Sequence, residues 1–426
     1  MGGGARAAYQ AGVLKAIAAL LRDARRGLDP TIAQGHNPFP ILLGTSAGAI
    51  NAAALAARAD NFQEAVAQIV HFWEDLRAED VYRADAFGVI RSGARWLTLL
   101  SIGWMLRRSW RMRPRSLLDN EPLRRLLGTI IDEPRLARAL ERGHLRALAV
   151  TASSYSSGRH VTFYQALRDY DFPAKRRRVY VRDRIGTDHL LASSAIPFVF
   201  PAVALDANPG GGAEVEFFGD GSMRQLSPVS PAIRLGAERI LVIGVGHAGA
   251  PGARSEEAPD EARDAALGAP GGASSDAPAA RSTAGYPSLA RVAGHALATI
   301  FLDALASDVE RLERMNRLAA GLTAQQRETY RLRPIETLVI APSEPLDGHA
   351  LQFRHTLPRP VRALFEVLGG RGGAEMLSYL LFESAYTQVL IDLGFRDTMA
   401  RRDAVLDFLT DRNAPSTGVA PRVVVV

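Results

Sequence analysis

Short apolar runs and longer amphipathic stretches alternate along this chain. Runs rich in Val, Leu, Ile, Phe or Ala predict strands at 39–43, 145–151, 161–165, 239–245 and 336–340. The run Ile240–Val245 is apolar throughout, which is typical of a parallel strand that is buried on both faces. Helical patterns lie before, between and after these strands, at 11–25, 49–57, 286–320, 359–369 and 374–410. Strands and helices that alternate at this spacing predict an α/β sandwich.

The same pattern predicts one domain over residues 1–410, because a strand (336–340) returns after a stretch with little to bury. That stretch, 246–285, consists mainly of Ala, Gly, Pro, Ser, Asp and Glu, and it predicts a disordered surface insertion. Residues 61–140 predict a helical, basic cap region in which Asp119 or Asn120 caps a helix started by Pro122. Residues 411–426 are left as a tail, since the closing run Val423–Val426 is too short to interpret.

A serine lies between two glycines where the strand 39–43 leads into the helix 49–57, in the order Gly44-Thr45-Ser46-Ala47-Gly48. A strand-to-helix turn of this kind exposes the serine hydroxyl above the sheet, and the helix that follows directs its positive end toward it. Gly44 and Gly48 leave room for the turn and for an approaching ester. The pattern predicts Ser46 as a nucleophile; a glycine-rich helix start that Ser46 merely caps is the alternative.

Two further segments can complement such a serine. Gly2, Gly3 and Gly4 lead into a helical pattern, so their successive N–H groups predict an anion-binding concavity, which in an esterase is an oxyanion hole. Arg6 would add a positive charge there or brace the loop. A dinucleotide fingerprint over Gly2–Ala7 is disfavoured, because it needs a preceding strand. Asp220 ends the alternating run 214–220 and can act as a general base within reach of Ser46, or simply form a turn.

In this order the three motifs resemble those of the bacterial patatin-like phospholipases. That family combines a Gly-Gly-Gly-x-Arg-Gly loop, a Gly-x-Ser-x-Gly elbow and an Asp-Gly-Gly/Ala motif; the segments 192–197 and 227–237 are also similar to family sequence. The resemblance is close from residue 2 to about 246. It implies a patatin-like three-layer α/β/α sandwich with a mostly parallel central sheet, and a lipid acyl hydrolase that acts on phospholipid or other lipid esters.

The resemblance also implies roles for single residues. Ser46 would attack the acyl carbonyl, and Asp220 would take its proton and later activate water, in a dyad without histidine. The oxyanion hole would comprise the loop residues Gly2, Gly3, Gly4, Ala5 and Arg6. No cofactor is implied, and no His or carboxylate cluster has metal-ligand spacing.

The chain departs from the family pattern in three places. Ala7 and Ser222 replace other small residues, and we expect little effect from them. Family members have a hydrophobic strand before the glycine loop, whereas Met1 stands directly at the loop. The hypothesis drawn from the sequence is a misassigned start; otherwise a central strand would be missing and the oxyanion loop would be tethered at one end only.

The net charge of +6 comes almost wholly from arginine, since Lys15 and Lys175 are the only lysines. The segment Arg91–Arg115 has seven arginines and no acidic residue, and it contains Trp96 and Trp104 within an apolar run. Tryptophan beside arginine is typical of a membrane interface, so the segment predicts peripheral membrane contact; a buried cap helix is the alternative. The run is too short to span a bilayer, which takes about 20 residues.

The other expectations follow from absences in the sequence. No nucleic-acid-binding module accompanies the basic charge, so no nucleic-acid partner is expected. No leader opens the chain, which predicts a cytoplasmic protein that contacts the inner membrane face.

Two alternative functions stay open at this point. One is a triad esterase of the order Ser46…Asp220…His247, although His247 lies where the low-complexity stretch begins and the other candidate, His295, lies on a predicted helix. The other is an interaction protein that keeps the scaffold and has lost the chemistry.

Overall fold

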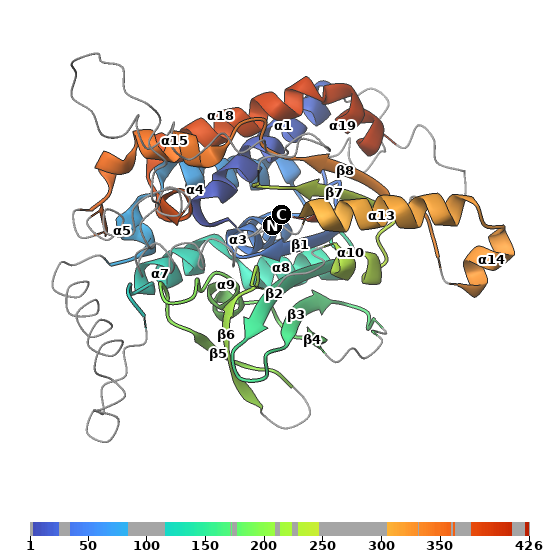
Figure 1. Cartoon of the computed structure of the whole chain (residues 1–426), viewed down its shortest axis with the longest axis horizontal. Coiled ribbons are helices and arrows are strands. Elements are labelled where there is room, and N and C mark those ends of the chain that lie inside the picture. Colours follow the sequence, from blue (N-terminus) through green and yellow to red (C-terminus); the bar gives the residue numbers. More distant parts are fainter. Residues whose placement is uncertain are drawn as a thin grey trace, which may run out of the picture.

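A computed structural model of the chain (Figure 1) describes most of its residues. The described ranges are 3–24, 35–83, 116–170, 172, 177–208, 214–223, 229–246, 305–330, 332–358, 361–362, 376–410 and 422–425. The predicted membrane segment Arg91–Arg115 and nearly all of the predicted insertion 246–285 lie outside these ranges. No helix of the described ranges is both long and apolar enough to cross a bilayer.

The elements of the described residues follow one another as helix and strand. The strands are β1 (Ile41–Thr45), β2 (Ala147–Ser154), β3 (His160–Ala166), β4 (Arg178–Arg182), β5 (Val203–Asp206), β6 (Val215–Asp220), β7 (Arg239–Ile243), β8 (Glu336–Ile340) and β9 (Arg422–Val425). The helices are η1 (Gly4–Ala7), α1 (Ala8–Asp23), α3 (Ala47–Ala57), α4 (Phe62–Asp75), α5 (Ala78–Val81), α7 (Glu121–Ile130), α8 (Glu133–Glu141), α9 (Thr187–Ser193), α10 (Ser230–Arg234), α13 (Leu305–Ala320), α14 (Ala324–Thr329), α15 (Leu346–Gln352), η3 (Arg354–Thr356), α18 (Ser384–Ala400) and α19 (Arg402–Leu409).

The strands form one sheet in the order β4-β3-β2-β1-β9-β7-β8, and the β5–β6 ribbon attaches to β2. The central strands β2, β1, β9, β7 and β8 all run parallel, whereas β3 and β6 are antiparallel to β2. Side chains of the central strands alternate between two apolar cores. Leu42, Leu241 and Val424 belong to the core with α1, α3, α4 and α18. Ile41 and Val423 belong to the core with α10 and α13.

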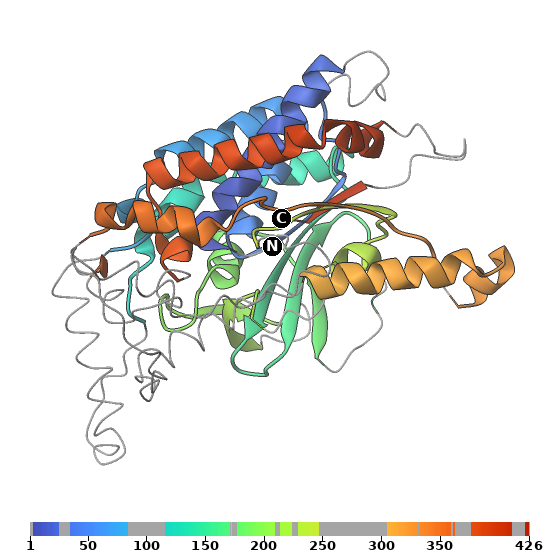
Figure 2. The same cartoon turned by 45° about the horizontal axis from the view of Figure 1, so that its top comes forward.

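Figure 2 shows these layers, with red α18 beside blue α1 on one face of the sheet and orange α13 on the other. The expected three-layer α/β/α sandwich with a mostly parallel central sheet is therefore confirmed. Both faces of the sheet are covered, which explains why the central strands β1, β7 and β9 are buried along their whole length.

The centre of the sheet holds a strand that the sequence left unassigned. Residues Arg422–Val425, at the end of the expected tail, form β9, which pairs in parallel with β1 on one side and with β7 on the other. All four residues are buried. Four residues are too few for a periodic pattern, so the strand is defined by its partners and not by its own sequence.

The expected helix 374–410 is interrupted in the structure. Glu383 has extended backbone angles and forms an isolated bridge with Arg77, so α18 begins only after it. A second break at Arg401 separates α18 from α19. The interruption lets α18 lie along α1, where the two backbones approach closely at Gly12 and Gly394: a Cβ at Gly12 would overlap the carbonyl oxygen of Ile391, and one at Gly394 would overlap that of Tyr9.

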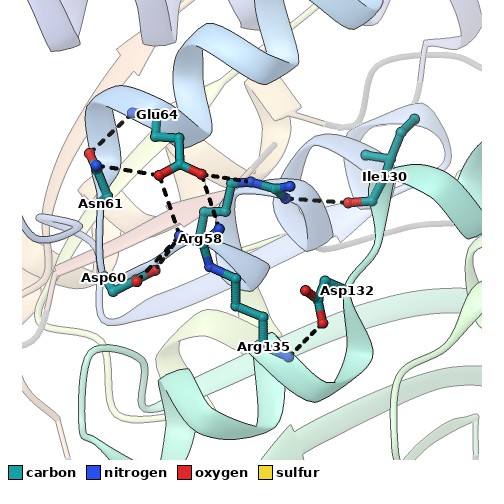
Figure 3. Close-up of polar contacts among 7 residues, drawn as sticks. All are labelled: Arg58, Asp60, Asn61, Glu64, Ile130, Asp132 and Arg135. Atoms are coloured by element: carbon teal, nitrogen blue, oxygen red, sulfur yellow. Dashed lines mark hydrogen bonds and ion pairs between the residues drawn. The ribbon is translucent and has the colours of Figure 1, made fainter.

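Part of the predicted cap region belongs to the helical layer itself. α4 packs against α1, α3 and α18. A cluster of charged residues then fixes the start of α8 to the α3–α4 turn (Figure 3). The Arg135 guanidinium donates to Glu64 at 3.0 Å and to Asp60 at 3.1 Å, while Arg58 lies 3.3 Å from Glu64 and donates to the carbonyl oxygen of Ile130 at 3.4 Å. These contacts, mainly the hydrogen bond from Arg135, lower the pKa of Glu64.

The helix predicted to start at Pro122 is α7, which begins at Glu121. Asn120 occupies the position before it, but the side chain that accepts from the helix is Asp119, whose Oδ1 lies 3.0 Å from the Glu121 nitrogen.

The contact between α1 and α18 generates a stability prediction. Gly12→Ala or Gly394→Ala should lower the free energy of unfolding by about 1–3 kcal/mol, because the added methyl group has to push two helix backbones apart. The matched control is Gly128→Ala in α7, where nothing lies within 4 Å of the added Cβ. That control should stabilise the protein by about 0.5–1 kcal/mol through the higher helix propensity of alanine. Urea unfolding of the three variants measures both effects, and equal stabilities for all three would contradict the close packing.

Candidate active site

Ser46 stands at the turn where β1 ends and α3 begins. Its backbone has φ 57° and ψ −135°, which an L-residue other than glycine rarely adopts. A Cβ at Gly44 would overlap Ala49, so this tight turn requires a glycine two residues before the serine. The motif thus lies on a tight strand-to-helix turn, and the strain at Ser46 costs roughly 1–3 kcal/mol that the surrounding packing has to offset.

The structure brings Ser46 and Asp220 together across 174 positions of sequence. Ser46 Oγ donates a hydrogen bond to Asp220 Oδ2 at 2.6 Å. Strand register produces this contact: Thr45 of β1 pairs with Thr151 of β2, and Asp220 of β6 pairs with Ala152, the next residue of β2. Strand β3 pairs with the other edge of β2, so β1 and β6 lie end to end along the same edge. The serine and the carboxylate therefore meet where these two strands end.

Asp220 is completely buried, and burial raises its pKa to about 6. Two hydrogen bonds oppose this rise, from the Ser46 hydroxyl and from the Ser222 N–H group, which lies 2.7 Å from Oδ1. The carboxylate is thus mainly ionised at neutral pH, yet it is more basic than a solvated aspartate. A base of this strength that accepts directly from a serine hydroxyl can take up its proton during an attack on an ester.

Ser193, at the end of α9, holds both halves of this pair and is a residue to which the sequence gave no role. Its fully buried Oγ accepts from the Ser46 N–H at 2.8 Å and donates to the Thr151 carbonyl oxygen at 2.7 Å. Its own carbonyl oxygen accepts from the Gly221 N–H at 3.1 Å. The only signal in the sequence was the segment 192–197, which resembles the family without indicating which residue matters.

The glycine loop lies against a segment far along the chain. Gly4 has φ +51°, and a Cβ there would overlap the carbonyl oxygen of Tyr379. Arg6 donates from Nε to Ser378 Oγ at 2.6 Å, and its guanidinium stacks 4.3 Å from the centre of the Tyr379 ring. Arg6 is 8 % exposed, so of its two expected roles the structure shows the bracing of the loop. Gly3, Gly4, Ala5 and Arg6 are described, whereas Gly2 lies outside the described residues.

Asn51 of α3 connects the glycine loop to the helix that follows Ser46, and it too was missed from the sequence. Its Nδ2 donates to the Ala7 carbonyl oxygen at 3.2 Å and to Gln10 Oε1 at 2.9 Å. Its Oδ1 accepts from Trp73 Nε1 at 2.8 Å. Helix α3 starts directly after Ser46, so these bonds fix the glycine loop and the elbow relative to each other.

Among the described histidines, His160 lies nearest to the Asp220 turn. Its Nε2 lies 2.8 Å from the Gly221 carbonyl oxygen, and burial lowers the pKa of its imidazole to about 4, so the ring is neutral and donates to that oxygen. It orders the turn. His247 and His295, the candidates for a triad, lie outside the described residues. Within the described ranges there is also no group of three or more His, Asp or Glu side chains that could hold a metal ion.

The buried carboxylate generates a prediction about stability. Because the pKa of Asp220 is about 6 in the folded protein and 3.8 in a free chain, its contribution to stability is complete below pH 4 and is lost as the pH rises through 6. Asp220→Asn removes this loss. The variant should therefore gain stability relative to the wild type between pH 4 and pH 8, on the order of 3 kcal/mol.

Thermal unfolding from pH 4 to pH 8 measures this gain. Asp403→Asn, which alters a carboxylate with a side chain 91 % exposed, is the control and should differ from the wild type equally at every pH. A constant difference for Asp220→Asn as well would contradict the raised pKa.

The comparisons with known proteins agree with this geometry. A model of the patatin-like phospholipase family matches residues 1–233, which is more than half of the chain and contains the glycine loop, the Ser46 elbow and the Asp220 turn. A comparison with curated proteins gives no match. The fold and the extent of the match show that the chain belongs to the patatin-like phospholipase family, a family of lipid acyl hydrolases.

Proposed function

We propose that this protein hydrolyses ester bonds of lipids, with Ser46 as the nucleophile and Asp220 as the general base. The observation that carries the proposal is the hydrogen bond of 2.6 Å from Ser46 Oγ to the buried carboxylate of Asp220. Membership of the patatin-like phospholipase family supports a lipid ester as the substrate class. The strained backbone of Ser46 supports a catalytic role as well, since strain of this kind gathers at functional sites.

In the first half of the reaction, Ser46 Oγ attacks the carbonyl carbon of the ester while its proton passes to Asp220 Oδ2. The negative charge that develops on the carbonyl oxygen would be stabilised by backbone N–H groups of the glycine loop and by the N-terminal end of α3. The bond to the leaving alcohol then breaks, and the alcohol oxygen takes the proton from Asp220. The product of this half is an ester between the fatty acyl group and Ser46.

In the second half, a water molecule attacks the acyl group on Ser46. Asp220, again ionised, takes a proton from this water, and the bond between Ser46 Oγ and the acyl carbon breaks. The proton returns from Asp220 to Ser46 Oγ. The fatty acid leaves, and the hydrogen bond between the two residues forms again.

The direct contact between serine and aspartate favours a dyad over the triad considered from the sequence. In a triad, an imidazole stands between the hydroxyl and the carboxylate and accepts from the hydroxyl. Here the hydroxyl already donates to the carboxylate, and Ser193 holds the serine backbone in the orientation that makes this bond. The same retained geometry supports an active enzyme over an interaction protein that has lost its chemistry.

The proposal includes the membrane contact expected from the sequence, through Arg91–Arg115 with Trp96 and Trp104. This segment lies outside the described residues, so the membrane contact stays a prediction. The cytoplasmic location stays a prediction as well, and phospholipid, lysophospholipid, glyceride and thioester substrates all stay open.

The nucleophile is tested by Ser46→Ala, measured on a short soluble ester and on phospholipid vesicles. We expect hydrolysis of both substrates by the wild type and a loss of about 10³-fold or more in the variant, because the variant lacks the hydroxyl that would form the acyl-enzyme. Ser384→Ala at the start of α18, whose Oγ only accepts from Gln388, is the matched control and should keep full activity. Near-normal turnover by Ser46→Ala, or silence of the wild type on both substrates, would contradict the proposal.

The base is tested by the dependence of kcat/KM on pH. Since only the ionised form of Asp220 can accept the proton, kcat/KM should be constant above its pKa of about 6 and fall tenfold per pH unit below it. The Asp220→Asn variant should lose turnover at every pH while remaining folded. An acidic limb near pH 4, or a variant that keeps turnover, would remove Asp220 from the mechanism.

A further inference from the structure

We propose that strand β9 positions the glycine loop of the active site, from the opposite end of the sequence. The strand occupies the place in the sheet above which the loop lies, so that a catalytic loop of the first residues depends on residues 422–425. The inference rests on the proposed function in one respect, since it takes the loop as the oxyanion site.

The first argument is the position of β9 in the sheet. Leu42 of β1 and Leu241 of β7 both pair with Val424, from its two sides. Neighbouring strands lie about 4.8 Å apart, so β1 and β7 are separated by about 9.6 Å, which is too far for hydrogen bonds between them. Each of the two strands pairs with β9 instead. Strand β9 is thus the link between the part of the sheet that carries Ser46 and Asp220 and the part formed by β7 and β8.

The second argument is the level at which the glycine loop lies. In the register of the sheet, Val425 is level with Leu43 of β1 and with Val242 of β7. Three residues further on, these two strands lead to Ser46 and to Val245. Gly3 lies beside Val245, since a Cβ at Gly3 would come within 2.8 Å of Val245 Cγ2. The described start of the loop is therefore at the carboxyl end of β7, the neighbour of β9, at the level of Ser46.

The third argument is the apolar core on the helical face of the sheet. Val424 is completely buried, and it belongs to the same apolar core as Ala5 of η1 and Ala8 of α1. The loop has other attachments: Ser378, Tyr379 and Asn51 lie on its helical side, and Val245, two residues after β7, lies beside Gly3 at the sheet. In the sheet, β9 lies between β1 and β7. Without β9, the buried backbone N–H and C=O groups on the facing edges of β1 and β7 would lose their hydrogen-bond partners.

The arrangement in space is the one that the family resemblance implies, with a strand, a glycine loop and a helix in succession. In the described residues, the strand between β1 and β7 is Arg422–Val425. If position in the sheet is what matters, then the same strand should serve equally well when it is joined to the loop.

This is tested with three chains: the full chain, a chain without residues 422–426, and a chain in which residues 421–426 are moved to stand directly before Gly2. Each is measured for hydrolysis of a short ester and, in a Ser46→Ala background, for hydrogen exchange of backbone amides in β1, β7 and residues 3–7. We expect the deletion to lower hydrolysis by about a hundredfold or more, as loss of oxyanion donors does, and to expose all three segments to exchange. The chain with the moved strand should recover both properties.

Point variants give the same test without a deletion. Val424→Asp places a charge in the apolar core that Val424 shares with Ala5, and it should act like the deletion. The matched control is Val215→Asp, the same change at a strand residue that is 62 % exposed, and it should leave hydrolysis and exchange unchanged.

Three results would overturn the proposal. The first is full hydrolysis and full protection in the deleted chain, and the second is a chain with the moved strand that is unfolded or as unprotected as the deleted one. The third is Val424→Asp behaving like Val215→Asp. If even the full chain fails to hydrolyse the ester, the proposed function fails, whereas the exchange measurements in the Ser46→Ala background still decide the role of β9.

Discussion

The hydrogen bond between Ser46 and Asp220 is the interaction on which the rest of the site depends, because it joins two groups that are each unfavourable alone. Asp220 is a carboxylate without exposure to water, and Ser46 has a strained backbone. A buried charge is tolerated only where hydrogen bonds replace its hydration. The Ser46 hydroxyl and the Ser222 N–H group provide this replacement, and the incomplete compensation leaves the pKa of Asp220 near 6. The residual cost of burial is therefore also the source of its basicity.

Strand register determines whether this bond can form at all. Ser46 follows Thr45, which pairs with Thr151, and Asp220 pairs with Ala152. The positions of both residues along β2 are therefore set by these two pairings. A slip of one residue in either pairing would move the side chain concerned to the other face of the sheet. The end of α9 secures the arrangement by a second route. Ser193 binds the Ser46 amide and the Gly221 amide, and the Ala195 carbonyl oxygen accepts from the Asp220 amide at 2.9 Å.

The features that the sequence predicted are those with a local signal. The Ser46 elbow requires glycines at fixed spacing, the Asp220 turn ends an alternating strand, and buried parallel strands are apolar throughout. Contacts between distant segments left no such signal. Ser193 and Asn51 are ordinary polar residues whose importance comes from partners 147 and 44 positions away. Strand β9 was missed for the same reason, since its four residues become a strand only between β1 and β7. The predicted helix 374–410 failed at Glu383, where the bridge to Arg77 overrides a helical pattern.

In the proposed mechanism, the glycine loop would act through backbone geometry and not through side-chain charge. Arg6 is the only cation of the described loop residues 3–7. It donates a hydrogen bond to Ser378 and stacks on the Tyr379 ring, on the side of the helical layer. Charge on an ester oxygen would then have to be met by N–H groups and by the end of α3, and the strength of such donors depends on their orientation. Orientation in turn depends on close packing, with Gly4 against Tyr379 and Gly3 against Val245. The orientation of the glycine loop is thus set by segments distant in sequence, Val245 beside Gly3 and Tyr379 beside Gly4.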